Sequence, residues 1–193
     1  STVLSTLSAY GLARYNNAAT RWSLYGILVT QMMPATLFLS PLFIIFTGMG
    51  LFDTFVPPVV YVCLHSIPFC VITLRPYFLG IPKELEDSAI IDGCNKFTAF
   101  LKIMVPISYP GIVVAAVFTF MWGWGDLMGA LTFIRSETLY PLTMNMYKSI
   151  GEYGTEWNKL MAYAVIVTAP VILIMIFLQR YLVSGLTSGA VKG

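Results

Sequence analysis

The sequence predicts an all-α fold, a polytopic transmembrane helical bundle with about five spans. Of its 193 residues, 58% are hydrophobic and only 10% are charged, whereas soluble domains carry about 25% charged residues. Four stretches contain no Asp, Glu, Lys or Arg: 22–52, 54–74, 103–125 and 160–179. Each stretch reaches the roughly 20 residues that a helix needs to cross a bilayer. Water therefore cannot be the main solvent of this chain.

The spans are expected to be helices because backbone groups in lipid must find partners within the protein. The unbroken apolar runs also lack the alternation of a membrane barrel strand. We place full crossings at 24–46, 57–78, 107–133 and 160–182, with 1–13 as a partial crossing. The chain does not begin with Met and has no signal-peptide pattern. We therefore expect an N-terminally truncated domain, the C-terminal part of a longer polypeptide.

Basic residues gather in alternate polar segments, and this pattern predicts the orientation of the spans. Lys and Arg are concentrated in the cytoplasmic loops of membrane proteins. Eight of the eleven basic residues fall in the first, third and fifth polar segments: Arg14, Arg21, Arg75, Lys83, Lys96, Lys102, Arg180 and Lys192. We therefore expect the 75–102 segment and the tail 183–193 on the cytoplasmic side, and the loop 135–159 on the extracytoplasmic side.

The segment 80–106 is too polar to cross a bilayer but is patterned as two short helices. Gly93 suits the left-handed residue that ends a helix, and Asn95 can cap the helix that follows. Apolar residues then recur at helical spacing at Phe97, Leu101 and Val105. Such a segment is either an ordinary solvated loop or a docking knob for a cytoplasmic partner. We favour docking, because ordinary loops rarely run this long with two capped helices.

The same segment resembles the EAA motif of ABC importer permeases, which reads EAA, three residues, G, nine residues and I-x-L-P. Asp87, Ser88 and Ala89 stand at the EAA positions, Gly93 follows at the expected spacing, and 103–106 reads IMVP. The run IPKELEDSAIIDG is similar to the form found in carbohydrate importers. The sequence departs from the motif by Asp for Glu at 87, Ser for Ala at 88 and Cys for Ala at 94.

The resemblance extends over most of the chain. LSAYGLAR (7–14), TQMMPATLFLSPLF (30–43) and GLFDT (50–54) are similar to family segments. FTFMWGWGDLMGALTF (118–133) is similar to the fifth family span, although the family's Trp-Asn-acidic triplet here reads Trp-Gly-Asp. The final QRYLVSGLTSGAVKG (179–193) resembles the tail of maltose-type permease G subunits. The resemblance implies a six-span permease whose first span and half of the second are absent from this sequence.

This resemblance implies a permease subunit of an ATP-driven ABC importer in a bacterial or archaeal cytoplasmic membrane. Such a subunit moves a sugar or oligosaccharide by alternating access. Its implied partners are a second permease subunit, two ATPase subunits and an extracellular or periplasmic substrate-binding protein, with no nucleic acid. The sequence has no G-x-x-x-x-G-K-[ST] phosphate loop. We therefore expect no ATPase site and no directly bound cofactor, with ATP and Mg carried by the partner ATPase subunits.

The resemblance also implies roles for particular residues. The family hairpin fits a cleft on the ATPase, which implies coupling through Glu86, Asp87, Ser88, Ala89, Asp92, Gly93 and Phe97. The tail of the maltose-type subunit reaches between the ATPase chains, which implies a contact through Gly185, Thr187, Ser188, Gly189 and Lys192. Its outer loop reaches into the binding protein, which implies a contact through Tyr147, Tyr153 and Trp157. Aromatic residues also anchor loops at the membrane interface, and this alternative stays open.

Trp122, Trp124 and Asp126 are candidates for the substrate path. Indole rings can stack on a sugar, and a carboxylate in an apolar segment marks a functional site by default. The alternative for Asp126 is a place near the outer interface, about 28 Å along a helix that starts near Ile107. We favour that alternative. His65 stands alone in a span, and a packing hydrogen bond is favoured over a proton relay.

Other classes of function account less well for the sequence. An ion-coupled secondary transporter needs ion-binding or titratable groups near the bilayer midplane, and only His65 comes near that place. An ABC importer for a non-sugar solute stays open as an alternative. An intramembrane enzyme lacks a catalytic constellation. The three cysteines have neither disulfide nor zinc spacing, so we expect no metal site.

Overall fold

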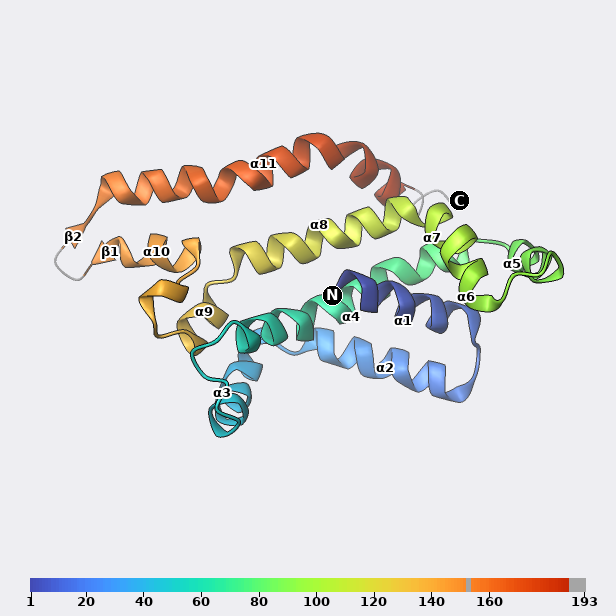
Figure 1. Ribbon diagram of the computed structural model, residues 1–193, viewed down its shortest axis with the longest axis horizontal. Coiled ribbons are helices and arrows are strands. Elements are labelled where there is room, and N and C mark those ends of the chain that lie inside the picture. The colour runs from blue at the N-terminus through green and yellow to red at the C-terminus, as the bar shows by residue number, and fades with distance from the viewer. Residues whose placement is uncertain (152–153, 188–193) are drawn as a thin grey trace. The chain divides into compact units, whose positions relative to one another are not determined.

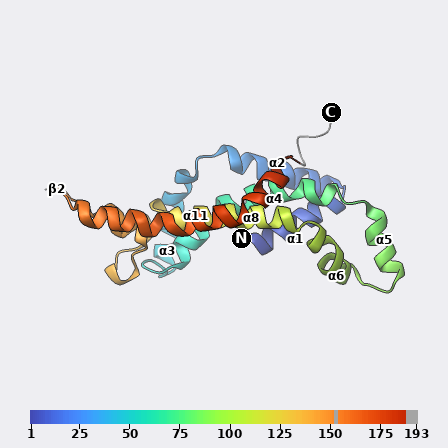
Figure 2. The same ribbon diagram turned by 90° about the horizontal axis from the view of Figure 1, so that it is seen from above.

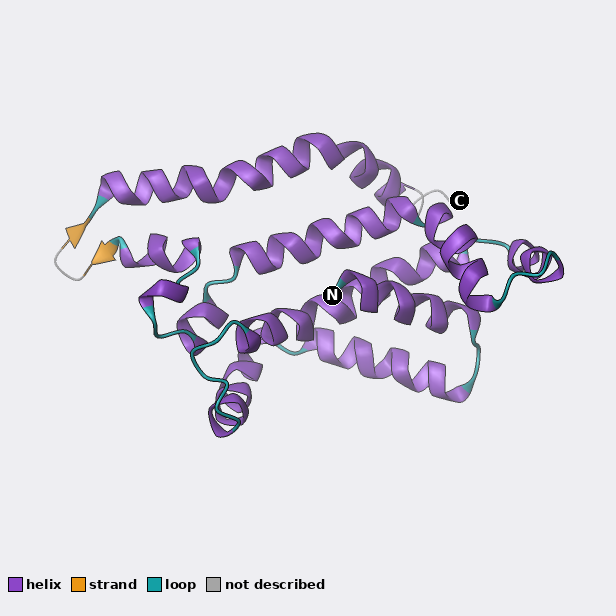
Figure 3. Cartoon of the chain, viewed as in Figure 1, coloured by secondary structure: helices purple, strands orange, loops and turns teal. Residues whose placement is uncertain are grey.

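The computed structural model describes residues 1–151 and 154–187, and these are helical nearly throughout (Figures 1 and 3). In chain order the helices are α1 (Thr2–Arg14), α2 (Ala18–Met32), η1 (Ala35–Phe38), α3 (Leu39–Gly48), α4 (Val56–Leu79), α5 (Lys83–Ile91), α6 (Lys96–Ala99), the π-helix η2 (Phe100–Met104), α7 (Val105–Ile107), α8 (Tyr109–Gly125), α9 (Met128–Phe133), η3 (Glu137–Leu139), α10 (Leu142–Lys148) and α11 (Trp157–Thr187). The strands β1 (Ile150–Gly151) and β2 (Gly154–Thr155) pair antiparallel. The predicted all-α class is confirmed.

Two of these helices are long and apolar enough to cross a membrane without a break. They are α4, over its whole length, and α11, over Trp157–Gln179. Two further candidates are bent pairs: α2 with η1 and α3, bent by 98°, and Lys96–Ile107 with α8, bent by 80°. The described residues therefore provide two spans, or up to four if each bent pair counts as one. The 13 residues of α1 are shorter than a crossing.

The crossing expected over 24–46 is broken by a sharp bend. The helix begins earlier, at Ala18, and stops at Met32. Pro34 has no N–H to continue the helix, and it pushes the residue before it out of the helical region. The chain resumes in η1, where the Leu37 N–H donates to the Pro34 carbonyl at 3.0 Å.

The crossing expected over 107–133 is divided among three helices. A bend at Ser108 separates α7 from α8, close to Pro110, which cannot donate a backbone hydrogen bond. α8 then ends at Gly125, and α9 starts afresh at Met128. The last helix extends further than the predicted crossing at both ends, since α11 covers Trp157–Thr187 rather than 160–182.

The chain divides into two compact units. Unit 1 contains Ser1–Gln31, Ile67–Thr119 and the chain from Leu178 onward, whereas unit 2 contains Met32–Ser66 and Phe120–Phe177. No linker-like composition in the sequence marks this division. Each unit has its own hydrophobic cluster.

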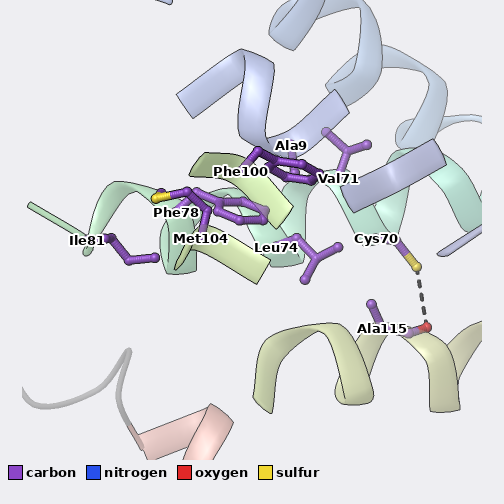
Figure 4. Packing of buried hydrophobic residues seen from close by; sticks show 9 residues of the cluster. All are labelled: Ala9, Cys70, Val71, Leu74, Phe78, Ile81, Phe100, Met104 and Ala115. Carbon is purple, nitrogen blue, oxygen red and sulfur yellow. Dashed lines mark hydrogen bonds between the residues drawn. The ribbon is translucent and has the colours of Figure 1, made fainter. Parts of the chain in front are cut away.

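The cluster of unit 1 joins α1, α4, η2 and α8 (Figure 4). Its buried members are Ala9, Cys70, Val71, Leu74, Phe78, Ile81, Phe100, Met104 and Ala115. The Cys70 thiol donates to the Ala115 carbonyl at 3.5 Å, which ties α4 to α8. Cys70 therefore packs as a small apolar residue within this cluster.

The cluster of unit 2 is built around Tyr61, Val62 and Phe133. Phe133 is fully buried, and Phe46 meets its ring edge-on at 6.3 Å between centroids. This contact joins α3 to α9.

Candidate functional site: the α5–α6 hairpin

The first helix of the hairpin, α5, ends in a Schellman motif. Gly93 has a φ of +89°, which is the left-handed region predicted for it. The Gly93 N–H donates to the Ile90 carbonyl at 3.1 Å, and the Cys94 N–H donates to the Ala89 carbonyl at 2.9 Å. These two bonds satisfy carbonyls that a helix end otherwise leaves unpaired. Gly93 thereby fixes the direction in which the chain leaves α5.

The second helix starts at once, because Asn95 caps α6. The Asn95 Oδ1 accepts a hydrogen bond from the Thr98 N–H at 2.8 Å, as predicted. After four residues α6 continues into the π-helix η2, a form that often occurs at functional sites. The predicted stripe of Phe97, Leu101 and Val105 lies along one cavity of about 280 Å³ in unit 1.

The first helix of the hairpin, α5, extends beyond the ends of α1 and α4 in both views of the chain (Figures 1 and 2). Its outer surface combines charge with large apolar side chains. Ile91 is 85% exposed and Phe97 is 63% exposed, and Asp87 and Asp92 are exposed beside them. Exposed apolar side chains within a polar protrusion are typical of a protein–protein contact. We call Asp87, Ser88, Ile91, Asp92, Gly93 and Phe97 the docking face.

Two of the seven predicted coupling residues lie away from this face. Ala89 is buried, with 5% of its surface exposed. The Glu86 side chain is 12% exposed, and its carboxylate is directed to α1, where it pairs with Arg14 Nε at 2.8 Å. The remaining five, Asp87, Ser88, Asp92, Gly93 and Phe97, are all exposed. The hairpin therefore has an outer face for a partner and an inner face that is already occupied.

Sequence reasoning missed the residues that hold this inner face. Tyr10 and Arg14 are four residues apart in the segment 7–14, so they share one face of α1. The sequence did contain a signal for this contact. Arg14 is the only charged residue of α1, and Tyr10 lies one turn before it, near the end of the helix. Their partner lies 76 residues away from Tyr10, in the hairpin.

The candidate substrate residues lie in unit 2 and are engaged within it. The Trp122 ring meets the His65 ring edge-on at 5.3 Å. The Trp124 Nε1 donates to the Val167 carbonyl at 2.9 Å, which ties α8 to α11. The Asp126 Oδ1 accepts from the Gly129 N–H at 3.1 Å and so closes the start of α9. The sequence predicted neither the Trp124 bond nor the local role of Asp126.

His65 makes a hydrogen-bond contact within its own helix, α4. Its Nδ1 lies 3.2 Å from the Tyr61 carbonyl oxygen, one turn earlier in α4. The rings of Tyr61 and Trp122 each meet the His65 ring edge-on.

The loop after α9 is held by Asp53, a residue that the sequence did not single out. The Asp53 Oδ1 accepts from the N–H groups of Arg135, at 2.8 Å, and Ser136, at 2.9 Å. Its Oδ2 accepts from the Ser136 hydroxyl. The hydroxyl bond, followed by the two N–H bonds, lowers the pKa of the Asp53 carboxyl below its ordinary value. Asp53 thus joins the α3–α4 connection to the start of the loop 135–159.

Further along this loop, two of the three predicted binding-protein contacts are exposed. Tyr147, on α10, is 49% exposed, and Trp157, at the start of α11, is 64% exposed. Residues 155–159, which include Trp157, line an open cavity of about 530 Å³. The third residue, Tyr153, lies outside the described residues.

The predicted tail contact falls only partly within the structure. Gly185 and Thr187 belong to the last turns of α11, which ends at Thr187, five residues beyond the expected end of the span at 182. Ser188, Gly189 and Lys192 lie outside the described residues. The tail that begins at 183 therefore starts as helix.

Comparison with known proteins identifies the chain. Residues 1–188 match the family described as "Binding-protein-dependent transport system inner membrane component". The chain belongs to this family. It is accordingly a multi-pass protein of the cytoplasmic membrane, and its apolar helices agree with that location. The family expected from the hairpin motif is confirmed.

Curated relatives within the family match the chain along nearly its whole length. It is 34% identical to the probable ABC transporter permease protein YurM of Bacillus subtilis, over 98% of this chain and 63% of the relative. It is 31% identical to the diacetylchitobiose uptake system permease protein DasC of Streptomyces coelicolor, over 100% of this chain and 70% of the relative. It is 34% identical to the trehalose transport system permease protein SugB of Mycobacterium tuberculosis, over 99% and 70%. The chain thus spans about two thirds of these relatives.

The fold also agrees with a solved transporter. A bacterial ABC transporter involved in the import of the acidic polysaccharide alginate superposes with a TM-score of 0.71. The match covers 93% of this chain and 71% of that chain at 21% identity. At this identity the likeness concerns the fold, which is that of an ABC transporter membrane domain.

Proposed function

We propose that this chain is a permease subunit of an ATP-driven importer that moves a sugar or oligosaccharide by alternating access. A substrate-binding protein outside the membrane delivers the solute. A second permease subunit completes the path, and two ATPase subunits, which bind ATP and Mg, dock from the cytoplasm. Family membership supports ATPase and binding-protein partners in general. The number of subunits and the class of solute are our proposal.

The names of the relatives support a carbohydrate substrate. DasC and SugB are named for the transport of diacetylchitobiose and trehalose, and both match this chain over almost all of its length. The hairpin sequence IPKELEDSAIIDG, similar to that of carbohydrate importers, points the same way. We propose Trp122, Trp124 and Asp126 as the residues nearest the solute path in unit 2.

The docking face is the observation that carries the proposed mechanism. Ile91 and Phe97 expose large apolar surfaces at the tip of a segment that is too polar to lie in lipid. A cleft on an ATPase subunit would bury both side chains. Fully burying an Ile stabilises a contact by about 1.5–3 kcal/mol. Loss of Ile91 should therefore weaken the contact by roughly 10- to 150-fold.

An exchange at Ile91 tests this contact. The complex is purified through a tag on this chain, and the ATPase retained by Ile91→Asn is compared with wild type. Ile150→Asn is the matched control, because Ile150 is also exposed, at 56%, but lies in the loop proposed to face outside. Loss of the ATPase from the Ile91 variant alone supports the docking face. Equal retention in both variants contradicts it.

The solute is tested on the same purified complex. The binding protein that co-purifies is denatured, and the released ligand is identified by mass spectrometry. Uptake of that ligand is then measured in proteoliposomes, with and without ATP. A sugar taken up only with ATP supports the proposal, whereas a non-sugar ligand contradicts the substrate class. Uptake driven by an ion gradient without ATP would favour a secondary transporter.

Two further contacts belong to the proposal. Tyr147, Tyr153 and Trp157 form the contact with the binding protein, supported by the exposure of Tyr147 and Trp157. The tail contacts the ATPase subunits through Gly185, Thr187, Ser188, Gly189 and Lys192, as the resemblance to maltose-type subunits implies.

A further inference from the structure

The inner face of the hairpin contains an ion pair that the docking role leaves unexplained. Glu86 Oε2 lies 2.8 Å from Arg14 Nε, and Glu86 Oε1 accepts a hydrogen bond from the Tyr10 hydroxyl at 2.5 Å. The side chains of Arg14 and Glu86 are only 8% and 12% exposed. Both oxygens of this carboxylate are therefore engaged by α1 and are not available to a second protein.

Arg14 contacts more of the hairpin than Glu86 alone. Its Nη1 donates to the Ile81 carbonyl at 3.1 Å, in the connection between α4 and α5. Its Nη2 donates to the Met104 sulfur at 3.4 Å, at the end of η2. One planar guanidinium thus joins the entry to the hairpin, its first helix and its exit.

Apolar side chains surround the Arg14–Glu86 ion pair and the Tyr10 ring and shield them from water. The Tyr10 ring packs on Phe78 and Phe100, with centroids 5.8 Å and 4.7 Å away. Phe78, Phe100 and Met104 are buried together in the cluster of unit 1, next to Ala9 (Figure 4). A charge pair with little access to water holds its geometry firmly, because separating the partners would leave a charge unpaired.

Two segments of the chain connect the hairpin to the neighbouring helices, and both are poorly suited to transmitting a movement because each contains a bend or an irregular turn. The entry passes through Gly80 and Pro82 between α4 and α5. The exit passes through the π-helix η2 and then the 80° bend at Ser108. A push on α5 could be absorbed at either connection. The contact with α1 is a third attachment that bypasses both.

We infer that Tyr10, Arg14 and Glu86 form a joint that makes α1 move with the hairpin. Glu86 is then a positioning residue: it transmits the movement that the docking face receives. This inference rests on the proposed function, since it assumes that an ATPase moves the hairpin. It assigns a specific task to a carboxylate that the family resemblance groups with the coupling residues.

The test measures solute transported per ATP hydrolysed in the purified, reconstituted complex. Glu86→Gln keeps an acceptor for Tyr10 but removes the charge facing Arg14. We expect this ratio to fall roughly tenfold or more, within the range of known coupling effects, while the ATPase subunits remain bound. Glu84→Gln is the matched control, because Glu84 is an exposed carboxylate on the same helix. It should keep the wild-type ratio.

A second pair of variants separates a joint from a general loss of structure. Arg14→Gln and the double variant Arg14→Gln, Glu86→Gln remove one and both charges. If the residues act as a unit, the double variant should lose no more than either single variant. Tyr10→Phe deletes only the hydroxyl and keeps the ring packing. It provides a milder probe, with a smaller fall in the ratio, if Glu86→Gln fails to insert.

The outcomes are distinct. A wild-type ratio in the Glu86, Arg14 and Tyr10 variants overturns the joint. Loss of the ATPase subunits from Glu86→Gln also overturns it, because Glu86 would then be a docking residue. Additive losses in the double variant count against a joint in the same way. If Ile91→Asn keeps its ATPase and its transport, the docking face of the proposed function fails, whatever the Glu86 variants do.

Discussion

Replacing Gly93 by Val tests whether the turn between α5 and α6 controls the docking face. A Cβ built at Gly93 meets no atom within 4 Å, so the added side chain finds open space. The penalty is conformational, because a φ of +89° is a region that a β-branched residue rarely adopts. Such strain costs about 1–3 kcal/mol. It would shift the equilibrium away from this turn by roughly 5- to 150-fold.

When the turn opens, the two hydrogen bonds of the Schellman motif are lost and α6 leaves α5 in a new direction. Phe97 is then displaced from Ile91, and the docking face no longer forms. We expect Gly93→Val to insert into the membrane but to uncouple ATP hydrolysis from uptake. Uptake and hydrolysis are measured together in proteoliposomes that contain the whole complex.

Gly93→Asn is the matched control for this experiment. Asn adds a larger side chain than Gly but tolerates left-handed backbone conformations, and it occurs at the same helix-end position. Its uptake should stay close to wild type. Wild-type uptake in Gly93→Val would refute the reasoning, because the turn would then have no part in coupling. Equal losses in both variants would refute the conformational explanation.

Three further predictions concern other parts of the chain. Deleting residues 188–193 leaves the described part of α11 intact and should weaken ATPase association in the purified complex; normal assembly would refute the tail contact. Trp157→Ala should reduce the stimulation of ATP hydrolysis by the binding protein without changing the basal rate, and unchanged stimulation would argue against that contact. Because hydrogen bonds lower the pKa of Asp53, its contribution to stability is present above its ordinary pKa of about 3.9 and is lost as the pH falls through the lowered value. The protection factor of the Ser136 amide, which is its intrinsic exchange rate at each pH divided by the observed rate, should therefore fall on acidification in wild type and be low at all pH values in Asp53→Ala.

The sequence predicted the features that depend on local chemistry. The hydrogen bonds formed at the Gly93 turn and at the Asn95 cap join residues only three to five positions apart in the sequence. Their roles could be predicted because few residue types suit a left-handed helix end or a helix cap. The apolar runs likewise predicted spans, since length and hydropathy are sufficient for that inference.

The breaks within the spans were harder to predict. Pro34 ends α2, yet Pro68 and Pro76 lie inside an unbroken α4. A proline in a membrane helix can bend it, break it or be accommodated, depending on which neighbours satisfy the freed carbonyls. Hydropathy alone cannot distinguish these outcomes. The break after Gly125 depends on Asp126, whose carboxylate supplies the first turn of α9 with an acceptor.

The inner and outer faces of α5 could not be separated from the sequence for a related reason. Glu84, Glu86 and Asp87 stand within four residues and carry the same charge, so composition treats them alike. Only the direction of each side chain distinguishes them, and that direction is set by the pairing of α5 with α1 across 76 residues. A motif read along the chain therefore merges two tasks, contact with a partner and attachment to a span. In this hairpin Glu86 performs the second task, and mutations of adjacent acidic residues should fail in different ways: Asp87 through lost ATPase binding, Glu86 through lost transport per ATP.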